Sequence, residues 1–493
     1  MRQFDHFIDG EWSAPASGGY LDSENPATGQ PWSRIAEGNA ADVDRAVAAA
    51  QNAFTGAWGA MTASKRGEVL WRMGDVLLEN VDTLAELETR DNGRIFSDMK
   101  GIVTYLAEFF RYYGGLADKM EGAVPPIEKA NYFNYTRHEP FGVVAALVPW
   151  NSPLLLAVWK LAPGLAAGNT FVIKPHEFAS AGVLELASLM ARSGFPAGTI
   201  NVVTGLGAEV GAPLVAHADV RKIAFTGGDV AGRSIAKSAA DTFKPVTLEL
   251  GGKSPNIVFA DANLDAAAKG TVMGMFTTNG QACVACSRVL VQRDVEAAFH
   301  ERLVHHTRAA RLGDPMNPDI DMGPLISAAH FERVMGFVTE ARAQGAACIL
   351  GGSKSAREGL EAGHFLEPTI LGGITNDMRI AQDEVFGPVM ACMTFDTEEE
   401  AVQIANDTRY GLGAGLWTED MRRAFRVSHQ LQAGSVYVNS FRVVSYMSPF
   451  GGYKQSGIGR ENGIEAIREY QQTKSVWFNL NEDAPAPFGK PYG

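Results

Sequence analysis

Cysteine and basic residues are scarce in this sequence of 493 residues. Four cysteines are too few for a disulfide framework in so long a chain, and none is spaced with histidines as in a zinc site, so no metal is expected. Lys and Arg number 43 against 56 Asp and Glu, which gives a net charge of −13. An acidic surface repels phosphate backbones and anionic lipids, so neither a nucleic acid nor a membrane is an expected partner.

Signals for export and for a membrane span are also missing. The N-terminus, MRQFDHFIDGEW, carries acidic residues where a signal peptide needs a basic start and an apolar core. The most apolar stretch, residues 141–167, is interrupted by three prolines and by Asn151 and Lys160, which excludes it as a transmembrane helix. We therefore expect a soluble, cytoplasmic protein.

The length of the whole chain predicts two or three domains. In its first half, short apolar runs alternate with helical patterns. Such alternation is typical of βαβ units, which build a parallel, doubly wound sheet with its ligands at the carboxyl ends of the strands. The expected strands are VVAALV (143–148), TFVIK (170–174), INVVT (200–204), KIAFT (222–226) and PVTLEL (245–250). Helices are expected between them, at 178–192 and 231–240.

Three further regions complete the predicted organisation. Helical patterns fill residues 40–94 and are interpreted as cover for the first sheet, without a chemical role. A second α/β series begins at NIVFA (256–260) and continues to SVYVNS (435–440), which predicts a second domain packed closely on the first. The segments 132–140 and 473–480 resemble exposed strands that could pair with another subunit.

Cys283 is the cysteine in the most polar surroundings, because TTNGQACVAC leaves its thiol accessible. Cys348 and Cys392 lie in apolar runs, as structural cysteines usually do. Cys286 is interpreted as a small packing residue, with a resolving thiol as the alternative. Cys283 is therefore the candidate nucleophile.

Glu249 lies near the end of the run PVTLEL, on the face opposite Val246 and Leu248, and is followed by two glycines. At that place a carboxylate projects toward the ligand edge of the sheet. Taken alone, it is better explained as an ordinary exposed glutamate at the end of a strand.

Two longer motifs give these residues a context. ELGGKSPNIVF (249–259) and NGQAC (279–283) resemble the two signature motifs of the aldehyde dehydrogenase superfamily, and they place Glu249 and Cys283 34 residues apart, as in that family. The resemblance continues, in the expected order, through VPWNSP (148–153), NTFVIKPHE (169–177), FTGG (225–228), EVFGPV (384–389) and SPFGGYKQSGIGRE (448–461). It covers nearly the whole chain.

The resemblance implies a mechanism. Cys283 adds to the aldehyde carbon, the thiohemiacetal loses hydride to the nicotinamide, and Glu249 activates the water that hydrolyses the thioester. The Asn151 side-chain amide and the Cys283 backbone N–H are implied to hold the oxyanion. From its sequence position alone, Asn151 is slightly better explained as a turn residue before Pro153.

The cofactor site lacks a GxGxxG fingerprint after the first strand, where PWNSP stands instead. Glycines in GLGAEVG (205–211) and GGDVAG (227–232) can present free N–H groups to phosphate, although they also suit plain turns. The resemblance implies cofactor contacts from Pro149, Trp150, Lys174, Glu177, Gly207, Gly211, Thr226, Gly227, Gly228, Leu250, Gly251, Glu384 and Phe386.

NAD is the expected cofactor, because the Glu177 carboxylate accepts hydrogen bonds from ribose hydroxyls and repels a 2′-phosphate. NADP remains the alternative, since Lys174 could stabilise that phosphate. Gly228 departs from the family pattern, in which a serine is frequent, and this departure points to weaker cofactor binding.

The substrate cannot be deduced from these motifs. By resemblance, its tunnel is lined by Tyr105, Ser152, Leu155, Trp159, Arg442, Val444 and Phe450, although most of these suit a core equally well. Ser152 stands where an aromatic is frequent, which indicates a wider or more polar pocket. Our hypothesis is that Arg442 favours a polar or carboxylate-bearing semialdehyde, and a solvent or subunit salt bridge is the alternative.

The implied architecture is a Rossmann-like cofactor domain (1–122 and 142–251), a second α/β catalytic domain (252–450), oligomerisation segments (123–141 and 470–493), and a return to the cofactor domain (451–469). The implied assembly is a homo-oligomer, either a dimer or a tetramer. Two alternatives to a hydrolytic enzyme remain: a CoA-acylating semialdehyde dehydrogenase, and a catalytically silent structural or binding protein on the same fold.

Overall fold

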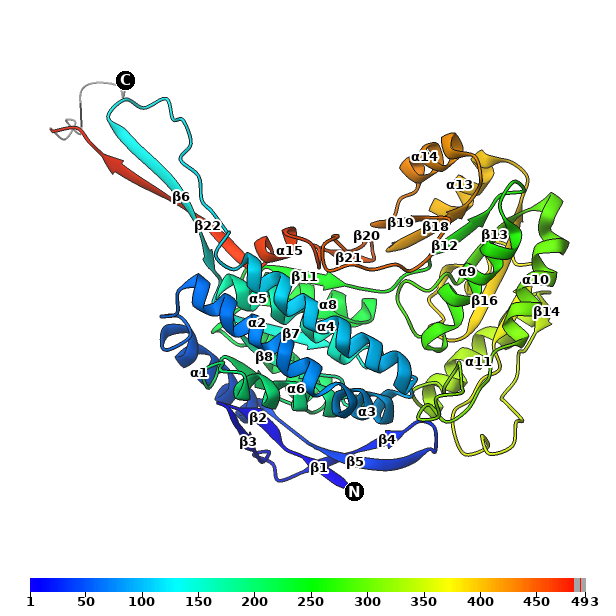
Figure 1. Cartoon of the computed structure of the whole chain (residues 1–493), viewed down its shortest axis with the longest axis horizontal. Helices are drawn as coiled ribbons and strands as arrows, with labels where there is room; N and C mark the ends of the chain where they lie inside the picture. Colours follow the sequence, from blue (N-terminus) through cyan, green and yellow to red (C-terminus); the bar gives the residue numbers. More distant parts are fainter. Residues whose placement is uncertain (483–487, 489–493) are drawn as a thin grey trace.

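Two α/β bodies lie side by side in the computed structural model, and a two-stranded ribbon projects from the first (Figure 1). The structure describes residues 1–482 and residue 488. The predicted α/β class, with a doubly wound sheet and a second α/β sheet, is confirmed. No helix in the described part of the chain combines the length and apolar character that a membrane crossing requires.

The first sheet has eight strands in the order β21-β11-β10-β7-β8-β9-β2-β3. Its five central strands are parallel and include all five that the sequence predicts. Strand order reverses at β7, because β8 and β10 flank it on opposite sides, and such a switch point opens a crevice at the carboxyl edge. The strands are β2 (His6–Ile8), β3 (Glu11–Ser13), β7 (Val143–Val148), β8 (Thr170–Pro175), β9 (Ile200–Val202), β10 (Val220–Thr226), β11 (Val246–Glu249) and β21 (Gly457–Ile458).

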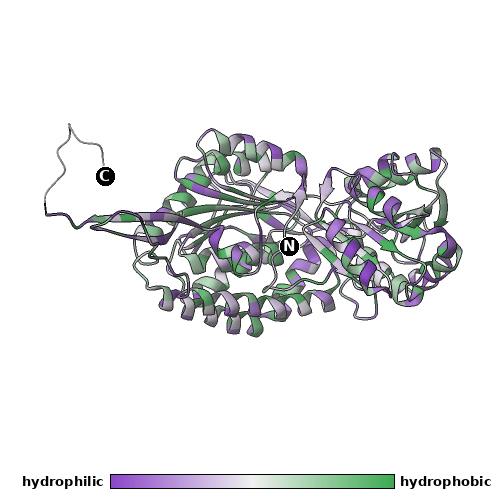
Figure 2. Cartoon of the chain, turned by 90° about the horizontal axis from the view of Figure 1, so that it is seen from above, coloured by the Kyte–Doolittle hydropathy of each residue, from purple (hydrophilic) through white to green (hydrophobic). Residues whose placement is uncertain are grey.

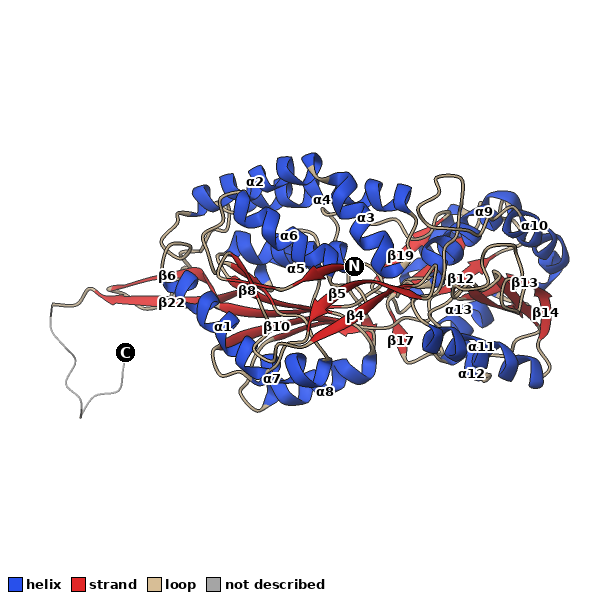
Figure 3. Ribbon diagram, turned by 90° about the horizontal axis from the view of Figure 1, so that it is seen from below, coloured by secondary structure: helices blue, strands red, loops and turns tan. Residues whose placement is uncertain are grey.

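Helices cover both faces of this sheet (Figure 3). The wholly apolar β7 suits this position, because Val144 and Ala146 enter one hydrophobic cluster while Val143 and Ala145 enter another. One face carries α5 (Pro153–Ala167) and α6 (Ala181–Arg192), with α2 (Ala63–Glu79), α3 (Val81–Asn92) and α4 (Phe96–Leu116) outside them; the other carries α1 (Ala40–Thr55), α7 (Ala212–Ala216) and α8 (Asp229–Ala240).

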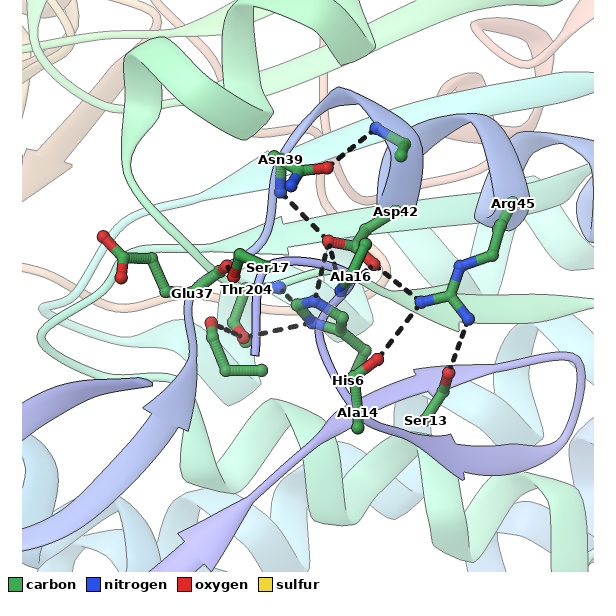
Figure 4. A network of polar contacts seen from close by, with 12 residues as sticks. His6, Ser13, Ala14, Ala16, Ser17, Glu37, Asn39, Asp42, Arg45 and Thr204 are labelled. Carbon is green, nitrogen blue, oxygen red and sulfur yellow. Dashed lines mark hydrogen bonds and ion pairs between the residues drawn. The ribbon is translucent and has the colours of Figure 1, made fainter. Parts of the chain in front are cut away.

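A buried histidine fixes the N-terminal strands to the first sheet (Figure 4). His6 Nδ1 accepts the N–H of Thr204 at 3.2 Å, and His6 Nε2 lies 3.5 Å from Asp42 Oδ2. Burial lowers the pKa of His6, in spite of the attraction of Asp42. Because Thr204 closes the loop after β9, this network also positions the start of the glycine segment 205–211. A small separate sheet contains β1 (Arg2–Phe4), β5 (Gln30–Ala36) and β4 (Tyr20–Asn25).

The second body has a seven-stranded sheet in the order β14-β15-β16-β13-β12-β18-β19, parallel except for β14. Figure 2 shows apolar residues along the strands of both sheets and hydrophilic residues on the outer sides of the helices. The strands of the second body are β12 (Pro255–Val258), β13 (Arg288–Gln292), β14 (Ala347–Leu350), β15 (Thr369–Gly372), β16 (Val389–Phe395), β18 (Gly413–Trp417) and β19 (Ser435–Val438). Its helices are α9 (Leu264–Phe276), α10 (Glu296–Arg308), α11 (Ala328–Ala343), α12 (Arg379–Gln382), α13 (Glu398–Asn406) and α14 (Met421–Gln430).

The chain passes from the first sheet to the second directly after β11, through residues 250–254. It returns near the C-terminus, where β20 (Tyr453–Lys454), β21 and α15 (Glu465–Arg468) lie beside the first body. β20 pairs with β17 (Tyr410–Gly411), and β21 pairs with β11. The junction of the two bodies is therefore made of the segments that carry the sequence motifs.

The ribbon consists of β6 (Tyr132–Pro140) and β22 (Gln471–Asn479), which pair with each other in antiparallel register (Figure 1). Within this chain the two segments pair with each other, and their pairing with another subunit, through the outer edges, stays a prediction. The ribbon exposes Phe133, Trp477 and Phe478. In the predicted segment 470–493, residues 483–487 and 489–493 lie outside the described residues.

The interpretation of residues 40–94 as simple cover is wrong at one point. α1 contacts the sheet directly, and α2 and α3 form the outer layer with α4, as cover should. The last residues of α3 and the turn after it reach the loop that follows β7, because Asn92 Nδ2 donates to Trp150 O at 3.2 Å and Arg94 Nη1 donates to Ser152 Oγ at 2.7 Å.

Candidate active site

A cleft of about 550 Å³ opens at the carboxyl ends of β7, β8 and β10, where the strand order reverses. Its walls include nine of the predicted cofactor residues: Pro149, Trp150, Lys174, Glu177, Gly207, Gly211, Thr226, Gly227 and Gly228. The cleft begins where each of these strands ends, because a parallel sheet directs the loops after its strands to one edge.

A second cavity, of about 250 Å³, shares Pro149, Trp150 and residues 226–228 with the first. It brings the predicted catalytic residues Cys283, Glu249 and Asn151 together with Leu250, Gly251, Glu384 and Phe386. The two sequence motifs thus meet at one cavity, at the junction of the two sheets.

The segment before Cys283 has an unusual backbone. Thr278 and Asn279 have φ values of 59° and 57°, a left-handed conformation that non-glycine residues rarely adopt. Two side-chain amides hold the segment to the loop 323–326: Asn279 Nδ2 donates to Pro324 O at 2.9 Å, and Gln281 Oε1 accepts the N–H of Ile326 at 3.0 Å. Backbone strain of this kind persists only where the surroundings enforce it.

The glycines of the Glu249 motif allow this segment to approach. A Cβ atom at position 252 would lie 2.3 Å from the carbonyl oxygen of Cys283, and one at position 251 would lie 2.6 Å from Glu384 Oε2. Only glycine lets the nucleophile loop and the Glu384 carboxylate lie so close to the strand end. The Gly252 N–H also donates to Glu384 Oε1 at 3.1 Å.

The Cys283 thiol is held in its neutral form. Burial, and after it the carboxylates of Glu384 and Glu249, raise the pKa of this thiol to about 12. The guanidinium of Arg442 and the N–H of Val284 oppose that rise. A base that takes the thiol proton is therefore needed before Cys283 can attack a carbonyl carbon.

Asn151 Nδ2 donates to the carbonyl oxygen of Gln281 at 3.0 Å. That bond fixes the amide group beside the nucleophile loop and uses one of its two N–H donors. No acceptor among the described residues takes the backbone N–H of Cys283. The second N–H of the Asn151 amide and the backbone N–H of Cys283 can thus both donate to an oxyanion.

Glu249 is buried, with 3% of its surface exposed, and neither carboxylate oxygen has a hydrogen-bond partner among the described residues. The pKa of Glu249 is raised well above its ordinary value, first by burial and then by repulsion from Glu461, while Lys160 and Arg460 oppose the shift. The reading of Glu249 as an ordinary exposed glutamate is therefore wrong. Such a carboxyl can accept a proton near neutral pH.

Lys160 and Glu461 form a buried ion pair next to Glu249 that sequence reasoning did not assign to the site. The Lys160 ammonium also donates to Thr226 Oγ1 at 2.6 Å. The sequence did contain an indication of this pair, because Lys160 is the single charged residue of the apolar helix α5. Glu461 lies in the quoted motif SPFGGYKQSGIGRE, although nothing in the sequence placed it behind Glu249.

The far end of the larger cleft carries a short polar cluster. Lys174 Nζ donates to Glu177 Oε2 at 3.2 Å, and burial lowers the pKa of the Lys174 ammonium. His176, which had no expected role, lines the same cleft, and burial lowers its pKa to about 4. The pKa of Glu177 is lowered because His176 and Lys174 outweigh the opposing effect of burial. Glu177 is therefore ionised at neutral pH.

Helix α11 holds the loop that carries Glu384 and Phe386, and no sequence pattern indicated this contact. Arg333 donates to the carbonyl oxygens of Glu384 and Val385, each at 2.7 Å. His330 Nε2 lies 2.7 Å from Phe386 O, and burial lowers the pKa of His330 to about 4. The neutral ring therefore donates this bond. Both side chains line the smaller cavity, as does Leu156 of α5.

The predicted substrate residues lie near Cys283 but are not among the residues that line the two cavities. The rings of Trp159 and Phe450 lie 5.1 Å apart, and the Tyr105 hydroxyl lies 3.4 Å from Val444 O. Leu155, Tyr105, Val444 and Cys283 all pack against the core cluster that contains Trp159 and Phe450. Ser152 is buried and bonded to Arg94, and Arg442 donates to the threonines that precede the nucleophile.

The other cysteines differ in part from expectation. Cys392 is buried, and so is Cys286, whose thiol contacts Thr271 O at 3.3 Å. Cys348 is exposed, although its apolar run predicts a structural residue. The cause is its place on β14, an edge strand that is only half covered.

Comparisons with known proteins agree with this geometry. Residues 12–476 match the sequence model of the family described as "Aldehyde dehydrogenase family". An aldehyde dehydrogenase of Aspergillus niger is 42% identical over 477 residues, covering 97% of this chain and 95% of that protein. A (Z)-2-((N-methylformamido)methylene)-5-hydroxybutyrolactone dehydrogenase of Acinetobacter baylyi is also 42% identical, covering 98% of both chains. The crystal structure of betaine aldehyde dehydrogenase from Staphylococcus aureus in complex with NAD+ superposes with a TM-score of 0.96 at 39% identity, covering 99% of this chain and 97% of that one.

Proposed function

The chain belongs to the aldehyde dehydrogenase family, and from this membership we propose that it oxidises an aldehyde to the carboxylic acid through a covalent adduct on Cys283 that Glu249 helps to hydrolyse. The observation that carries the proposal is that Cys283, Glu249 and Asn151 line one cavity of about 250 Å³. A nucleophile, a base and an oxyanion donor within one cavity are what acyl transfer requires.

The first step is attack of Cys283 on the aldehyde carbon. The high pKa of this thiol means that its proton has to be removed during the attack. As the carbonyl becomes tetrahedral, its oxygen gains negative charge. The second N–H of the Asn151 amide and the backbone N–H of Cys283 stabilise that charge.

The second step is oxidation of the adduct. NAD is the cofactor of this enzyme, and when bound it supplies the acceptor for the hydride of the adduct. Oxidation leaves a thioester on Cys283. Glu249 then takes a proton from water as the water attacks the thioester carbon, and the thiol is released with the acid.

The residues of the larger cleft fit NAD. The cleft of about 550 Å³ leads into the reaction cavity through the shared residues 149–150 and 226–228, so one elongated ligand can occupy both. At its far end the ionised Glu177 suits the two ribose hydroxyls and repels a 2′-phosphate. At its near end Glu384, with one oxygen held by the Gly252 N–H, suits the second ribose.

The substrate that suits Arg442 is a polar or carboxylate-bearing semialdehyde. Arg442 opposes the rise in the pKa of Cys283, so its positive charge acts at the reacting sulfur, and its loop also carries Val444, whose carbonyl oxygen lies 3.4 Å from the Tyr105 hydroxyl. A guanidinium there can bind a carboxylate at the far end of the aldehyde.

An assay of NADH formation tests the proposal. Purified enzyme is given aliphatic, aromatic, amino and carboxylated aldehydes with NAD or NADP, with and without CoA. We expect NADH and free acid without CoA, at a higher kcat/KM with NAD. A strict requirement for CoA would instead support the acylating alternative, in which CoA rather than water removes the acyl group.

Replacement of the nucleophile tests the covalent step. We expect Cys283→Ser to abolish NADH formation while it still binds NAD, because serine is a far weaker nucleophile at neutral pH. Cys286→Ser is the matched control, because this buried neighbour lies outside both cavities. NADH formation by Cys283→Ser at the wild-type rate would contradict the mechanism.

A further inference from the structure

The end of α3 lies between two loops that determine the geometry of the reaction cavity. Residues 92–94, here called the α3 turn, are all buried. On one side the turn contacts residues 149–152, here called the oxyanion loop because they include Asn151. On the other side it contacts the loop 323–326, which holds the segment before Cys283. The mechanism above gives the α3 turn no part.

Two side chains of the α3 turn hold the oxyanion loop. Asn92 Nδ2 donates to Trp150 O at 3.2 Å, and Arg94 Nη1 donates to Ser152 Oγ at 2.7 Å. The Ser152 hydroxyl in turn donates to Asn151 O at 2.8 Å. A hydroxyl that accepts a bond from a cation is polarised and donates more strongly. The carbonyl oxygens of Trp150 and Asn151 are therefore both fixed from the α3 turn, the second one through Ser152.

Helix α3 also holds the chain directly after the oxyanion loop. Glu88 is fully buried, and its Oε2 accepts the N–H of Leu154, in the first turn of α5, at 3.1 Å. Such a bond satisfies one of the N–H groups that the start of a helix leaves without an internal partner. Within the turn, Asn92 Oδ1 accepts the N–H of Arg94 at 3.0 Å, which fixes the two side chains relative to each other.

Gly93 makes the contact with the loop 323–326. Its φ is 74°, and a Cβ atom there would lie 2.7 Å from Pro324 Cγ, while a Cβ at position 323 would lie 2.2 Å from Gly93 O. The same loop is bonded to the segment before Cys283, because Asn279 Nδ2 donates to Pro324 O and the Gly323 N–H donates to Asn279 Oδ1, both at 2.9 Å. The α3 turn thus relates the oxyanion loop to the nucleophile through backbone contacts.

This support matters because the side chain of Asn151 is not fixed by its own bond. Asn151 Nδ2 donates one N–H to Gln281 O at 3.0 Å, and a single bond leaves the amide free to tilt about it. The direction of the second N–H then depends on where the Asn151 backbone is held. Donors to an oxyanion stabilise it strongly only when they already point at the place where the charge develops.

We propose that Asn92 and Arg94 are positioning residues of the oxyanion site: they hold the Asn151 backbone so that the second amide N–H points at the carbonyl oxygen of an aldehyde attacked by Cys283. The inference rests on the proposed function and goes beyond it, because neither side chain lines the reaction cavity. Loss of either side chain lets the oxyanion loop shift, which weakens the bond to the oxyanion and leaves the thiol in place.

A double-mutant cycle tests whether Arg94 acts through Asn151. The measured quantity is kcat/KM for NADH formation from the aldehyde that gives the highest rate in the screen above. We expect Asn151→Ala to lower it by about 10²- to 10³-fold, and Arg94→Met by about 10- to 100-fold. The double variant should be no slower than Asn151→Ala alone. Losses that multiply in the double variant would overturn the proposal, because Arg94 would then act independently of Asn151.

Two further variants change one bond at a time. Arg94→Lys should keep most of the activity, because an ammonium group can still donate to Ser152 Oγ. Asn92→Asp keeps the acceptor for the Arg94 N–H and loses the donor to Trp150 O, so it should lower kcat/KM as Arg94→Met does. It also covers the case in which Arg94→Met does not fold. Wild-type kcat/KM in Asn92→Asp would overturn the role of Asn92.

Alkylation of Cys283 by iodoacetamide separates a displaced oxyanion donor from a disturbed nucleophile. This reaction displaces iodide and forms no oxyanion, so its rate should be the same in wild type and Arg94→Met. Arg66→Met is the matched control and should leave both reactions unchanged, because Arg66 has a buried Nε without a partner among the described residues and donates to Met61 O.

A fall in the alkylation rate of Arg94→Met as large as its fall in kcat/KM would overturn the proposal, because the thiol itself would then have moved. An equal loss of kcat/KM in Arg66→Met would also overturn it, since any buried arginine would have the same effect. Failure of the proposed function is a different result: wild type would then form no NADH from any aldehyde of the screen.

Discussion

Glu249 shows how strongly one residue depends on its surroundings. In the sequence it is a carboxylate at the end of a strand, and in the fold it is buried without a hydrogen-bond partner among the described residues. Burial and the charge of Glu461 both favour the neutral acid, whereas Lys160 favours the carboxylate. The balance raises the pKa, and this converts an ordinary acidic residue into a base suited to neutral pH.

The pH dependence of hydrolysis should report this shift. Glu249 acts as a base only when ionised, and because its pKa is raised, the ionised fraction grows at pH values well above those of an ordinary carboxyl. Single-turnover hydrolysis of the thioester should therefore slow as the pH falls through this raised pKa. Stopped-flow measurement between pH 5 and 9 checks the prediction. A rate already constant from pH 5 upward would contradict it.

Glu249→Gln should separate the two halves of the reaction. The amide cannot take a proton from water, so hydrolysis should slow by about 10²- to 10⁴-fold. Rapid mixing should then show a burst of NADH of one equivalent per active site, followed by a slow steady state. Titration with NAD provides the control, because cofactor affinity should change little. Loss of the burst together with steady-state activity would indicate that Glu249 also serves the first step.

At the scale of elements, glycines allow the end of the first sheet to approach the nucleophile loop of the second body. The link after β11 passes so close to the nucleophile loop that a Cβ at position 252 would lie 2.3 Å from Cys283 O. The position of the thiol thus depends on a contact between the end of β11 in the first sheet and the loop before β13 in the second.

Gly252→Ala should move the nucleophile. Backbone has to shift to admit the methyl group, and a displacement of about 1 Å typically costs about 10²-fold in rate. We expect kcat to fall by that factor with a modest loss of Tm. Gly336→Ala is the matched control, because a Cβ there meets nothing within 4 Å. Wild-type kcat in Gly252→Ala would show that the loop position is not critical.

Gly228 is a second position where the place of a residue in its helix determines the effect of a substitution. It is the N-cap of α8, with φ −71° and ψ 151°, and a Cβ there enters open space beside the cofactor cleft. Gly228→Ser should stabilise the helix by a few tenths of a kcal/mol and tighten NAD binding. Calorimetric titration and a thermal melt check both effects. Weaker NAD binding by the variant would show instead that the hydroxyl crowds the cofactor.

On the scale of the whole molecule, the β6–β22 ribbon is too exposed to be stable in isolation. It stands away from the body and presents Phe133, Trp477 and Phe478 to solvent (Figure 1). β19 ends the second sheet with a free edge. Exposed aromatics on a ribbon and an unpaired strand edge both favour association with further copies.

We expect a homo-oligomer that depends on the ribbon. Light scattering should give a mass of two or four subunits for wild type, and the double variant Trp477→Asp, Phe478→Asp should shift it to a smaller species. The reason is that two charges cannot be buried in an apolar interface without loss of free energy. Trp71→Asp, a change of an exposed aromatic on α2, is the control. A monomeric wild type would contradict the prediction.

Much of this fold could be predicted because its strands and helices have clear periodicity. β7 and β8 are uninterrupted apolar runs, and α6 and α8 place apolar residues three and four positions apart, so local patterns were sufficient. The pairing of β6 with β22 could not be predicted, because their partners are more than 300 residues apart in the chain. The role of the end of α3 was missed because its bonds to the loop after β7 join residues 58 positions apart, which local patterns do not reveal.

The sequence by itself determined the family, the α/β class, the candidate nucleophile and base, and the preference for NAD, because each rests on residue types at fixed short spacings. Tertiary structure alone decided the environments. It buried Glu249 beside Lys160 and Glu461, and it brought Arg94 to Ser152, 58 positions further along the chain. Burial and charge act through space, so they decide pKa values and specificity only after distant segments have packed together.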